Sequence, residues 1–287
     1  MEINVPPPAR SAQSPHTPMI PHTIHYCWFG GRPLPESARK CIASWRKFLP
    51  DYEIREWNEQ TFDVNLIPYT REAYAAGKYA FVSDYARFWI LYHHGGLYFD
   101  TDVELIRPLD DILARGAFMG REAGACISAI CDASMLEASA ARQGGADLGV
   151  NPGLGLGVAP GRGLYREMLD LYAALRFRRE DGTLNQKTIV AYTTEVLLRH
   201  GLSGDNDRPQ HVAGVWVYPP DVFCPMDHTQ ANRLTLTPRT VSIHHYDCSW
   251  LDHRTFSFRL HLLKNWLARR FGVERVERIA QLIRSKK

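Results

Sequence analysis

The segment that decides the fold is residues 79–102, YAFVSDYARFWILYHHGGLYFDTD. Its first part predicts a helix from Val82 to His94, because apolar side chains recur at the spacing of one helix face. These side chains are Tyr85, Phe88, Trp89 and Tyr92. Gly95 is a residue type that commonly ends a helix, and residues 97–99 form a short apolar run typical of a strand. A helix, a Gly-Gly turn and a strand in this order indicate an α/β unit.

Two acidic residues follow this strand directly. Asp100 and Asp102 lie two positions apart, so in an extended chain their side chains point the same way. Paired carboxylates suit a hard divalent cation such as Mg²⁺ or Mn²⁺, which keeps open positions for phosphate oxygens. Such an ion would neutralise the charge on a departing diphosphate. By itself, an Asp-Thr-Asp triplet is more often a solvated turn.

Polar residues also occupy the predicted helix. Asp84 and Arg87 are three positions apart and share a face opposite the aromatic one. Taken alone, they indicate an exposed pair that contributes little to stability, and Asp84 after Ser83 also fits a capped helix start. The order of polar helix face, Gly-Gly turn, strand and paired acids favours a functional site instead.

The flanking sequence extends the same pattern. Residues 22–29 and 52–57 are β-prone, and residues 35–48 between them have helical spacing, which predicts a layered α/β domain. Later elements are expected at residues 164–177 and 188–199 as helices and at 212–218 and 240–245 as strands. Residues 116–163 are rich in Gly and Ala, and there Asn151-Pro152-Gly153 is expected to open a loop.

The two ends of the chain differ in composition from the middle. Residues 1–18 are rich in Pro, Ser and Ala and are expected to be a disordered leader before a single domain at 19–259. Residues 260–287 have the pattern of a basic amphipathic helix, which would dock on an anionic membrane surface or pack on the domain. No apolar run is long enough to span a bilayer, and no signal-peptide pattern is present.

Composition restricts the location and the partners. The net charge of +3 is too small to favour nucleic acid as a partner. The six cysteines form no C-x-x-C pair, so we expect reduced thiols in a cytoplasmic protein, peripheral at the inner membrane face if the tail docks there.

Three runs together resemble the DXD-containing glycosyltransferases of family thirty-two: residues 22–31 (HTIHYCWFGG), 79–102 and 242–250 (SIHHYDCSW). That family includes bacterial capsular polysaccharide synthesis proteins and fungal mannosyltransferases, with the large glucosylating toxins as more distant relatives. The resemblance covers residues 20–250 and keeps the family's motif order. It implies a GT-A fold with a mixed sheet, a nucleotide-sugar donor, a divalent metal and retention of anomeric configuration.

The resemblance also implies a role for each matching residue. Asp84, Arg87, Asp100 and Asp102 would form the catalytic set. Donor-binding residues would be Trp28, Ser83, Asp84, Arg87, Tyr98, Asp100, Ser249 and Trp250. Metal ligands would be Asp102, Asp100 and His244, with His245 as the alternative to His244. Asn151 would lie on the acceptor side.

The residues themselves support some of these roles. Trp28 precedes a Gly-Gly turn at a strand end, where a flat ring can stack on a base, although a core tryptophan fits equally well. Only one of His244 and His245 can face the site, because neighbouring strand side chains point to opposite faces. Asn58 follows the second predicted strand and could reach the base or ribose, although asparagine there is more often a turn residue.

The expected function is a retaining, metal-dependent transfer of a sugar from a UDP- or GDP-linked donor to a glycan or lipid-linked acceptor, in bacterial surface polysaccharide synthesis. The alternatives are a metal-dependent nucleotide-sugar hydrolase and a non-catalytic, membrane-associated binding module. No nucleophile of the double-displacement type is evident, so front-face attack and a covalent intermediate both stay open.

Overall fold

The computed structural model describes residues 19–122, 149–227 and 233–246. The expected leader at 1–18, the basic segment at 260–287 and the predicted donor-binding residues Ser249 and Trp250 lie outside these ranges. Within the ranges, no helix combines the length and the apolar character that crossing a membrane requires.

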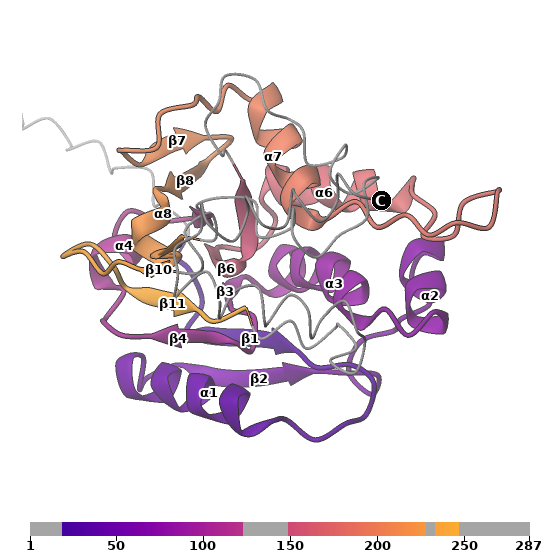
Figure 1. Cartoon of the computed structure of the whole chain (residues 1–287), viewed down its shortest axis with the longest axis horizontal. Coiled ribbons are helices and arrows are strands. Elements are labelled where there is room, and N and C mark those ends of the chain that lie inside the picture. The colour runs from indigo at the N-terminus through magenta and orange to yellow at the C-terminus, as the bar shows by residue number, and fades with distance from the viewer. Residues whose placement is uncertain (1–18, 123–148, 228–232, 247–287) are drawn as a thin grey trace, which may run out of the picture.

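A seven-stranded sheet forms the centre of the protein (Figure 1). Its strand order is β2-β1-β3-β6-β5-β8-β7. Parallel pairing joins β1 to β2, β1 to β3 and β5 to β8, whereas β6 runs antiparallel to both β3 and β5, and β7 to β8. The predicted α/β class with a mixed sheet is therefore confirmed. The strands are β1 (Thr23–Cys27), β2 (Glu53–Trp57), β3 (Gly96–Tyr98), β5 (Phe118–Arg121), β6 (Val150–Val158), β7 (Gln210–Val212) and β8 (Val215–Tyr218).

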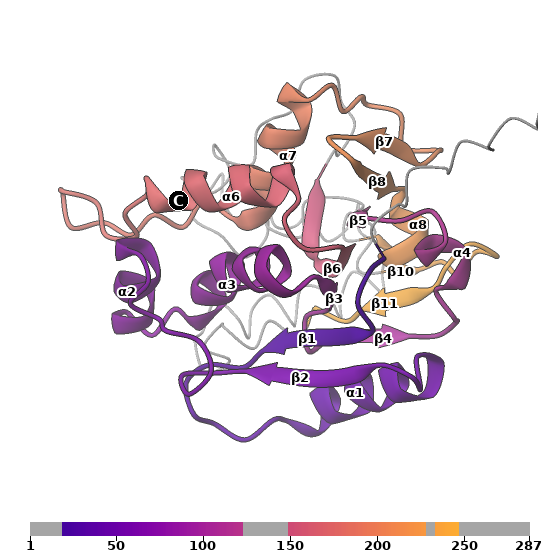
Figure 2. The same ribbon diagram turned by 180° about the vertical axis from the view of Figure 1, so that it is seen from behind.

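Helices cover both faces of this sheet, as the two opposite views show (Figures 1 and 2). Helices α2, α3, α6 and α7 pack on one face, and α1, α4, α8 and β4 pack on the other. The helices are α1 (Glu36–Phe48), α2 (Pro68–Ala75), α3 (Tyr79–His94), α4 (Asp110–Leu113), α6 (Gly163–Ala173), α7 (Ile189–Arg199) and α8 (Pro220–Phe223). The smaller strands are β4 (Val103–Leu105), β9 (Met226–Asp227), β10 (Arg233–Leu234) and β11 (Ser242–His244).

A hydrophobic core lies on each face of the sheet, because successive side chains along a strand point to opposite faces. Ile24 and Tyr26 of β1 pack toward α1, whereas Cys27 packs toward α3. In the same way, Tyr98 at the end of β3 faces α3, and Phe99 just beyond it faces α1. This period of two is the pattern of a strand that is buried on both faces.

The helix predicted at Val82–His94 is α3, which begins three residues earlier, at Tyr79, and ends at His94, followed by Gly95 with a φ of +64°. A left-handed φ of this kind suits glycine at a helix end. The single strand predicted at 212–218 is instead the hairpin β7–β8, which turns at Ala213 and Gly214. Helix α2 was not predicted.

The prediction of a loop at Asn151-Pro152-Gly153 was wrong. These residues lie in β6, a nine-residue strand that is buried along its whole length. The glycines that suggested a loop are required by packing: a Cβ at Gly153 would overlap the Asp100 carboxylate, and one at Gly157 would overlap the Phe118 ring. The residues that require glycine here are close in space but distant in the sequence. Local composition therefore predicted a loop where the chain forms a strand.

Candidate active site

The predicted donor residues gather at one edge of the sheet. Because β1, β2 and β3 run parallel, their carboxyl ends meet at the same edge, and Trp28, Asn58 and Asp100 follow these ends. In open α/β sheets, ligands bind at this edge, where the strand order reverses. Strand β6 runs antiparallel to β3 and reaches the same edge with its N-terminal part. There, Asp100 N donates to Gly153 O at 3.1 Å.

Asp100 and Asp102 lie on a tight turn between β3 and β4. Val103 N donates to Asp100 O at 3.0 Å, which closes the turn. The expectation of an extended segment was therefore wrong, although the two carboxylates still approach a common point. Their third neighbour comes from β11, because His244 pairs with Val103 in the antiparallel β4–β11 ladder.

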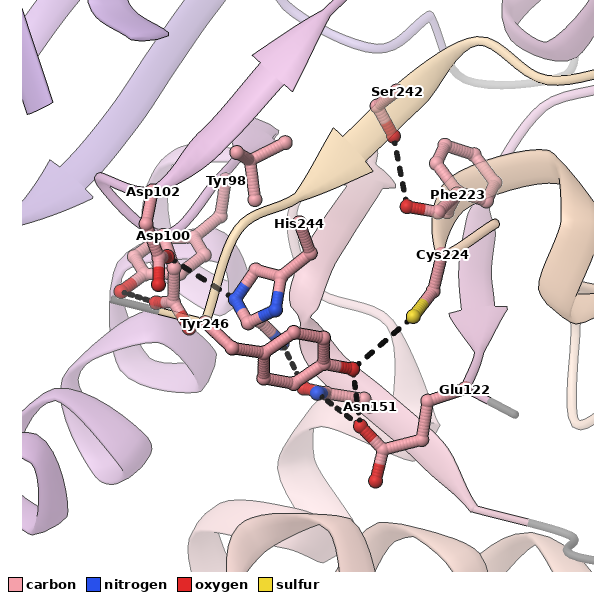
Figure 3. A network of polar contacts seen from close by, with 12 residues as sticks. Tyr98, Asp100, Asp102, Glu122, Asn151, Phe223, Cys224, Ser242, His244 and Tyr246 are labelled. Carbon is pink, nitrogen blue, oxygen red and sulfur yellow. Dashed lines mark hydrogen bonds and ion pairs between the residues drawn. The ribbon is translucent and has the colours of Figure 1, made fainter. Parts of the chain in front are cut away.

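The three side chains form a candidate metal centre (Figure 3). One potential ligand atom of each of Asp100, Asp102 and His244 lies within 4.8 Å of the other two. His244 Nε2 is 3.1 Å from Asp102 Oδ1, and His244 Nδ1 is buried without a hydrogen-bond partner among the described residues. Two carboxylates and one imidazole are ligands that Mn²⁺ and Mg²⁺ sites use, so this donor set fits the expected ion.

The structure distinguishes His244 from His245. The His245 ring is exposed and its Nε2 lies 2.9 Å from Glu104 Oε2, so it points away from the centre. His244 is buried, and burial by itself lowers its pKa. The Asp102 carboxylate and, more weakly, Asp100 outweigh burial and raise the pKa of His244 overall.

A buried arginine connects helix α3 to this centre. The Arg87 side chain is 4% exposed, and its guanidinium lies 3.0 Å from Asp84 Oδ1 and 3.2 Å from Asp100 Oδ1. Its Nε also donates to Ser83 O at 3.1 Å, and the guanidinium lies over the Tyr98 ring. The geometry excludes the alternative of a weak surface pair, because a buried ion pair of this kind fixes the position of both partners.

Asp84 is the most deeply enclosed carboxylate of this group. Burial raises the pKa of Asp84 to about 7, because the nearby Arg87 offsets the loss of solvent only in part and Asp100 adds a like charge. Tyr98 completes the cluster, since its hydroxyl donates to Asp100 Oδ1 at 3.0 Å. Asp100 is thus held by two buried groups while its side chain stays 30% exposed and open to a ligand.

The remaining predicted donor residues lie at the periphery. Trp28 is half-buried beyond β1, and its ring nitrogen donates to Arg32 O. Asn58 forms a turn, because its side chain accepts from Gln60 N at 2.9 Å and donates to Glu56 Oε1. In this structure Asn58 is therefore a turn residue, which was one of the two interpretations of its sequence position. Ser83 donates to Tyr79 O within the helix.

Two residues of the site were missed in the sequence. Glu122 is 3% exposed just after β5, and Tyr246 follows β11. Glu122 Oε2 accepts from Asn151 Nδ2 at 2.7 Å and from the Tyr246 hydroxyl at 2.9 Å (Figure 3). The sequence contains no comparable signal for Glu122, because the charged Arg121 precedes it, whereas the apolar Phe99 precedes Asp100.

Comparison with known proteins agrees with this geometry. Residues 35–119 match a family model described as a glycosyltransferase sugar-binding region containing a DXD motif. This region contains Asp84, Arg87, Asp100 and Asp102, and it excludes Trp28 and His244.

Two curated proteins are similar over a comparable part of the chain. Inositol phosphoceramide mannosyltransferase 1 of Schizosaccharomyces pombe is 29% identical over 111 residues, which are 35% of this chain and 33% of that protein. Uncharacterized glycosyltransferase L373 of Acanthamoeba polyphaga mimivirus is 33% identical over 106 residues, which are 35% of this chain and 42% of that protein. The chain thus spans less than half the length of these relatives.

Two solved structures align with part of the chain. PaToxG glycosyltransferase aligns with a TM-score of 0.43 and 17% identity over 63% of this chain and 70% of that one. The galactosyltransferase LgtC, in complex with donor and acceptor sugar analogues, aligns with a TM-score of 0.40 and 15% identity over 84% of this chain and 94% of that one. Over residues 35–119, then, the chain is similar to the DXD-containing, sugar-binding region of glycosyltransferases.

Proposed function

We propose that this protein transfers a sugar from a nucleotide-sugar donor to an acceptor, with a divalent ion held by Asp100, Asp102 and His244. The observation that carries the proposal is the convergence of these three side chains beside the buried Arg87–Asp84 pair. The family match over residues 35–119 supports it, because that match includes both acids of the DXD motif.

The chain's own residues have defined tasks in this proposal. The bound ion would supply positive charge for the diphosphate of the donor, as Mn²⁺ or Mg²⁺ does in such sites. Asp84 and Arg87, with Ser83 and Tyr98 beside them, bind the donor sugar and its phosphate, and Asp100 holds the ribose or sugar. Trp28 stacks on the base, and Asn151 lies on the acceptor side. Ser249 and Trp250 cover the diphosphate.

Finer assignments follow from the sequence resemblance to family thirty-two. They are a retaining outcome, a UDP- or GDP-linked donor, a glycan or lipid-linked acceptor and a role in bacterial surface polysaccharide synthesis. Because one relative is named an inositol phosphoceramide mannosyltransferase, a mannose-bearing donor and a lipid acceptor are the first to test. We also propose that residues 260–287 hold the protein reversibly on anionic membranes, since clustered Lys and Arg attract such surfaces.

The test is a screen of UDP- and GDP-sugars for consumption that requires Mn²⁺, with and without candidate acceptors. A transferase consumes donor much faster when the right acceptor is present. If one donor is consumed equally fast without any acceptor, the protein is a nucleotide-sugar hydrolase. If no donor binds in the presence of Mn²⁺, the proposal is wrong.

A further inference from the structure

Glu122 is a buried carboxylate to which the proposed reaction assigns no task. Its two described hydrogen bonds, from Asn151 Nδ2 at 2.7 Å and from the Tyr246 hydroxyl at 2.9 Å, reach the same oxygen, Oε2. An ionised carboxylate in the interior is costly unless it is well hydrogen-bonded, so its burial at this place requires an explanation. The two donors lie on separate elements, and each leads to a different ligand of the candidate metal centre (Figure 3).

The first connection leads through β6 to Asp100. Asn151 is 8% exposed, and its amide has a fixed orientation, because Nδ2 donates to Glu122 while Oδ1 accepts from Gly153 N at 2.7 Å. Gly153 O in turn accepts from Asp100 N at 3.1 Å, and the Asp100 carboxylate occupies the space that a Cβ at Gly153 would need. The orientation of Asn151 therefore sets the surface against which Asp100 lies.

The second connection leads through Tyr246 to His244. The two rings meet edge to face, with centroids 3.9 Å apart and planes at 87°. Tyr246 has a φ of +53°, a conformation that is strained for a non-glycine residue and that persists only where its surroundings hold it. The Tyr246 hydroxyl contacts Glu122 Oε2 at 2.9 Å and Cys224 Sγ at 3.1 Å, and we infer that these contacts help to hold that conformation.

We propose that Glu122 is a positioning residue that couples the two sides of the metal centre, Asp100 through Asn151 and His244 through Tyr246. Partners that orient metal ligands in this way control metal affinity without contacting the ion. This inference rests on the proposed metal site, and it assigns a specific task to a residue outside that site.

The experiment measures the affinity for Mn²⁺ alone, from the EPR signal of the free ion, together with the thermal midpoint of the metal-free protein. Glu122→Ala is expected to weaken Mn²⁺ binding by about 10- to 100-fold. Glu122→Gln is expected to keep affinity close to that of the wild type, because one carboxamide oxygen can accept both hydrogen bonds. Tyr246→Phe keeps the ring on His244 and is expected to cause a smaller loss, and it should add little in the Glu122→Ala background.

Glu72→Ala is the matched control, because Glu72 also accepts two hydrogen bonds, from Arg176 and Arg178, at a distant surface. It should lower the thermal midpoint and leave Mn²⁺ affinity unchanged. If Glu122→Ala and Tyr246→Phe also leave Mn²⁺ affinity unchanged, Glu122 has only a structural role and the inference fails. If the wild type binds no Mn²⁺, or Asp102→Ala binds it equally well, the proposed metal site itself has failed.

Discussion

The two halves of the candidate site are encoded in different ways. Asp84, Arg87, Asp100 and Asp102 come from one short stretch of chain, in which helix α3, the Gly-Gly turn and β3 set their relative positions. Asn151 and His244 lie in β6 and β11, and Glu122 follows β5, so these three residues are far apart in the sequence. The first half is visible as a local motif, whereas the second exists only when β6 and β11 are in place. If the site holds a metal as proposed, binding is expected to require the pairing of β11 with β4 as well as the local turn.

The largest expected effect is the loss of nucleotide binding when a metal ligand is removed, which tests whether the two halves of the site bind one ion. Asp102→Ala removes a ligand from the local half and His244→Ala one from the distant half. Each should abolish Mn²⁺-dependent nucleotide binding, because the diphosphate loses its counter-charge. Isothermal titration with UDP and GDP in the presence of Mn²⁺ measures this.

His245→Ala is the control for that pair, since His245 faces Glu104 at the surface. It should bind nucleotide as the wild type does. If His245→Ala is as harmful as His244→Ala, the β11 register described here is wrong.

The next effect concerns stability within the local half. Arg87→Ala leaves two carboxylates, Asp84 and Asp100, without their buried partner, which should cost about 3–5 kcal/mol of unfolding free energy. Denaturant titration measures the loss. Arg166→Ala breaks an exposed pair with Asp170 and should cost much less than Arg87→Ala, because solvent screens the exposed charges. Equal losses in the two variants would contradict a buried anchoring role for Arg87.

A pH effect on stability of similar size is expected from His25. This residue lies in β1 and contacts Gly95, in the turn that precedes β3. His25 is buried, and its Nδ1 accepts from Trp57 while Nε2 donates to Gly95 O. Burial lowers the pKa of His25 from 6.5 to about 4. Between these values the unfolded chain binds a proton that the folded chain does not, so stability falls as the pH drops from 6.5 to 4, by on the order of 3 kcal/mol.

The measurement is the unfolding free energy against pH for the wild type and His25→Gln. The variant should lose this part of the slope while keeping the acid sensitivity of its other groups. An unchanged slope would show that His25 does not set this pH dependence.

The smallest effect concerns the base of the donor. Trp28→Ala should weaken nucleotide binding by about 1–3 kcal/mol if the ring stacks on the base. The neighbouring Phe29 would be a poor control variant, because it is 7% exposed and packs on Phe62, so its loss would also disturb the core. Tyr52, half-buried before β2 at the opposite edge of the sheet, is a better one. If Tyr52→Ala weakens binding as much as Trp28→Ala, stacking at Trp28 is not the cause.

Sequence reasoning succeeded where the determinants are local. The periodicity around Tyr85 and Phe88 placed α3 within three residues, and the acids after Phe99 identified the DXD turn. It failed where distant contacts decide. Gly153 is glycine because Asp100 fills its side-chain position, and no neighbour of Gly153 in the sequence reveals this. The burial of Asp84 is a similar case, since the elements that cover it lie elsewhere in the chain.

The most direct test of the central claim is a crystal structure with Mn²⁺ and UDP or GDP, with anomalous scattering recorded at the manganese edge. The account predicts one anomalous peak coordinated by Asp100, Asp102 and His244, with the diphosphate on its open side. A peak at another location, or a nucleotide bound without an ion at these three residues, would contradict it.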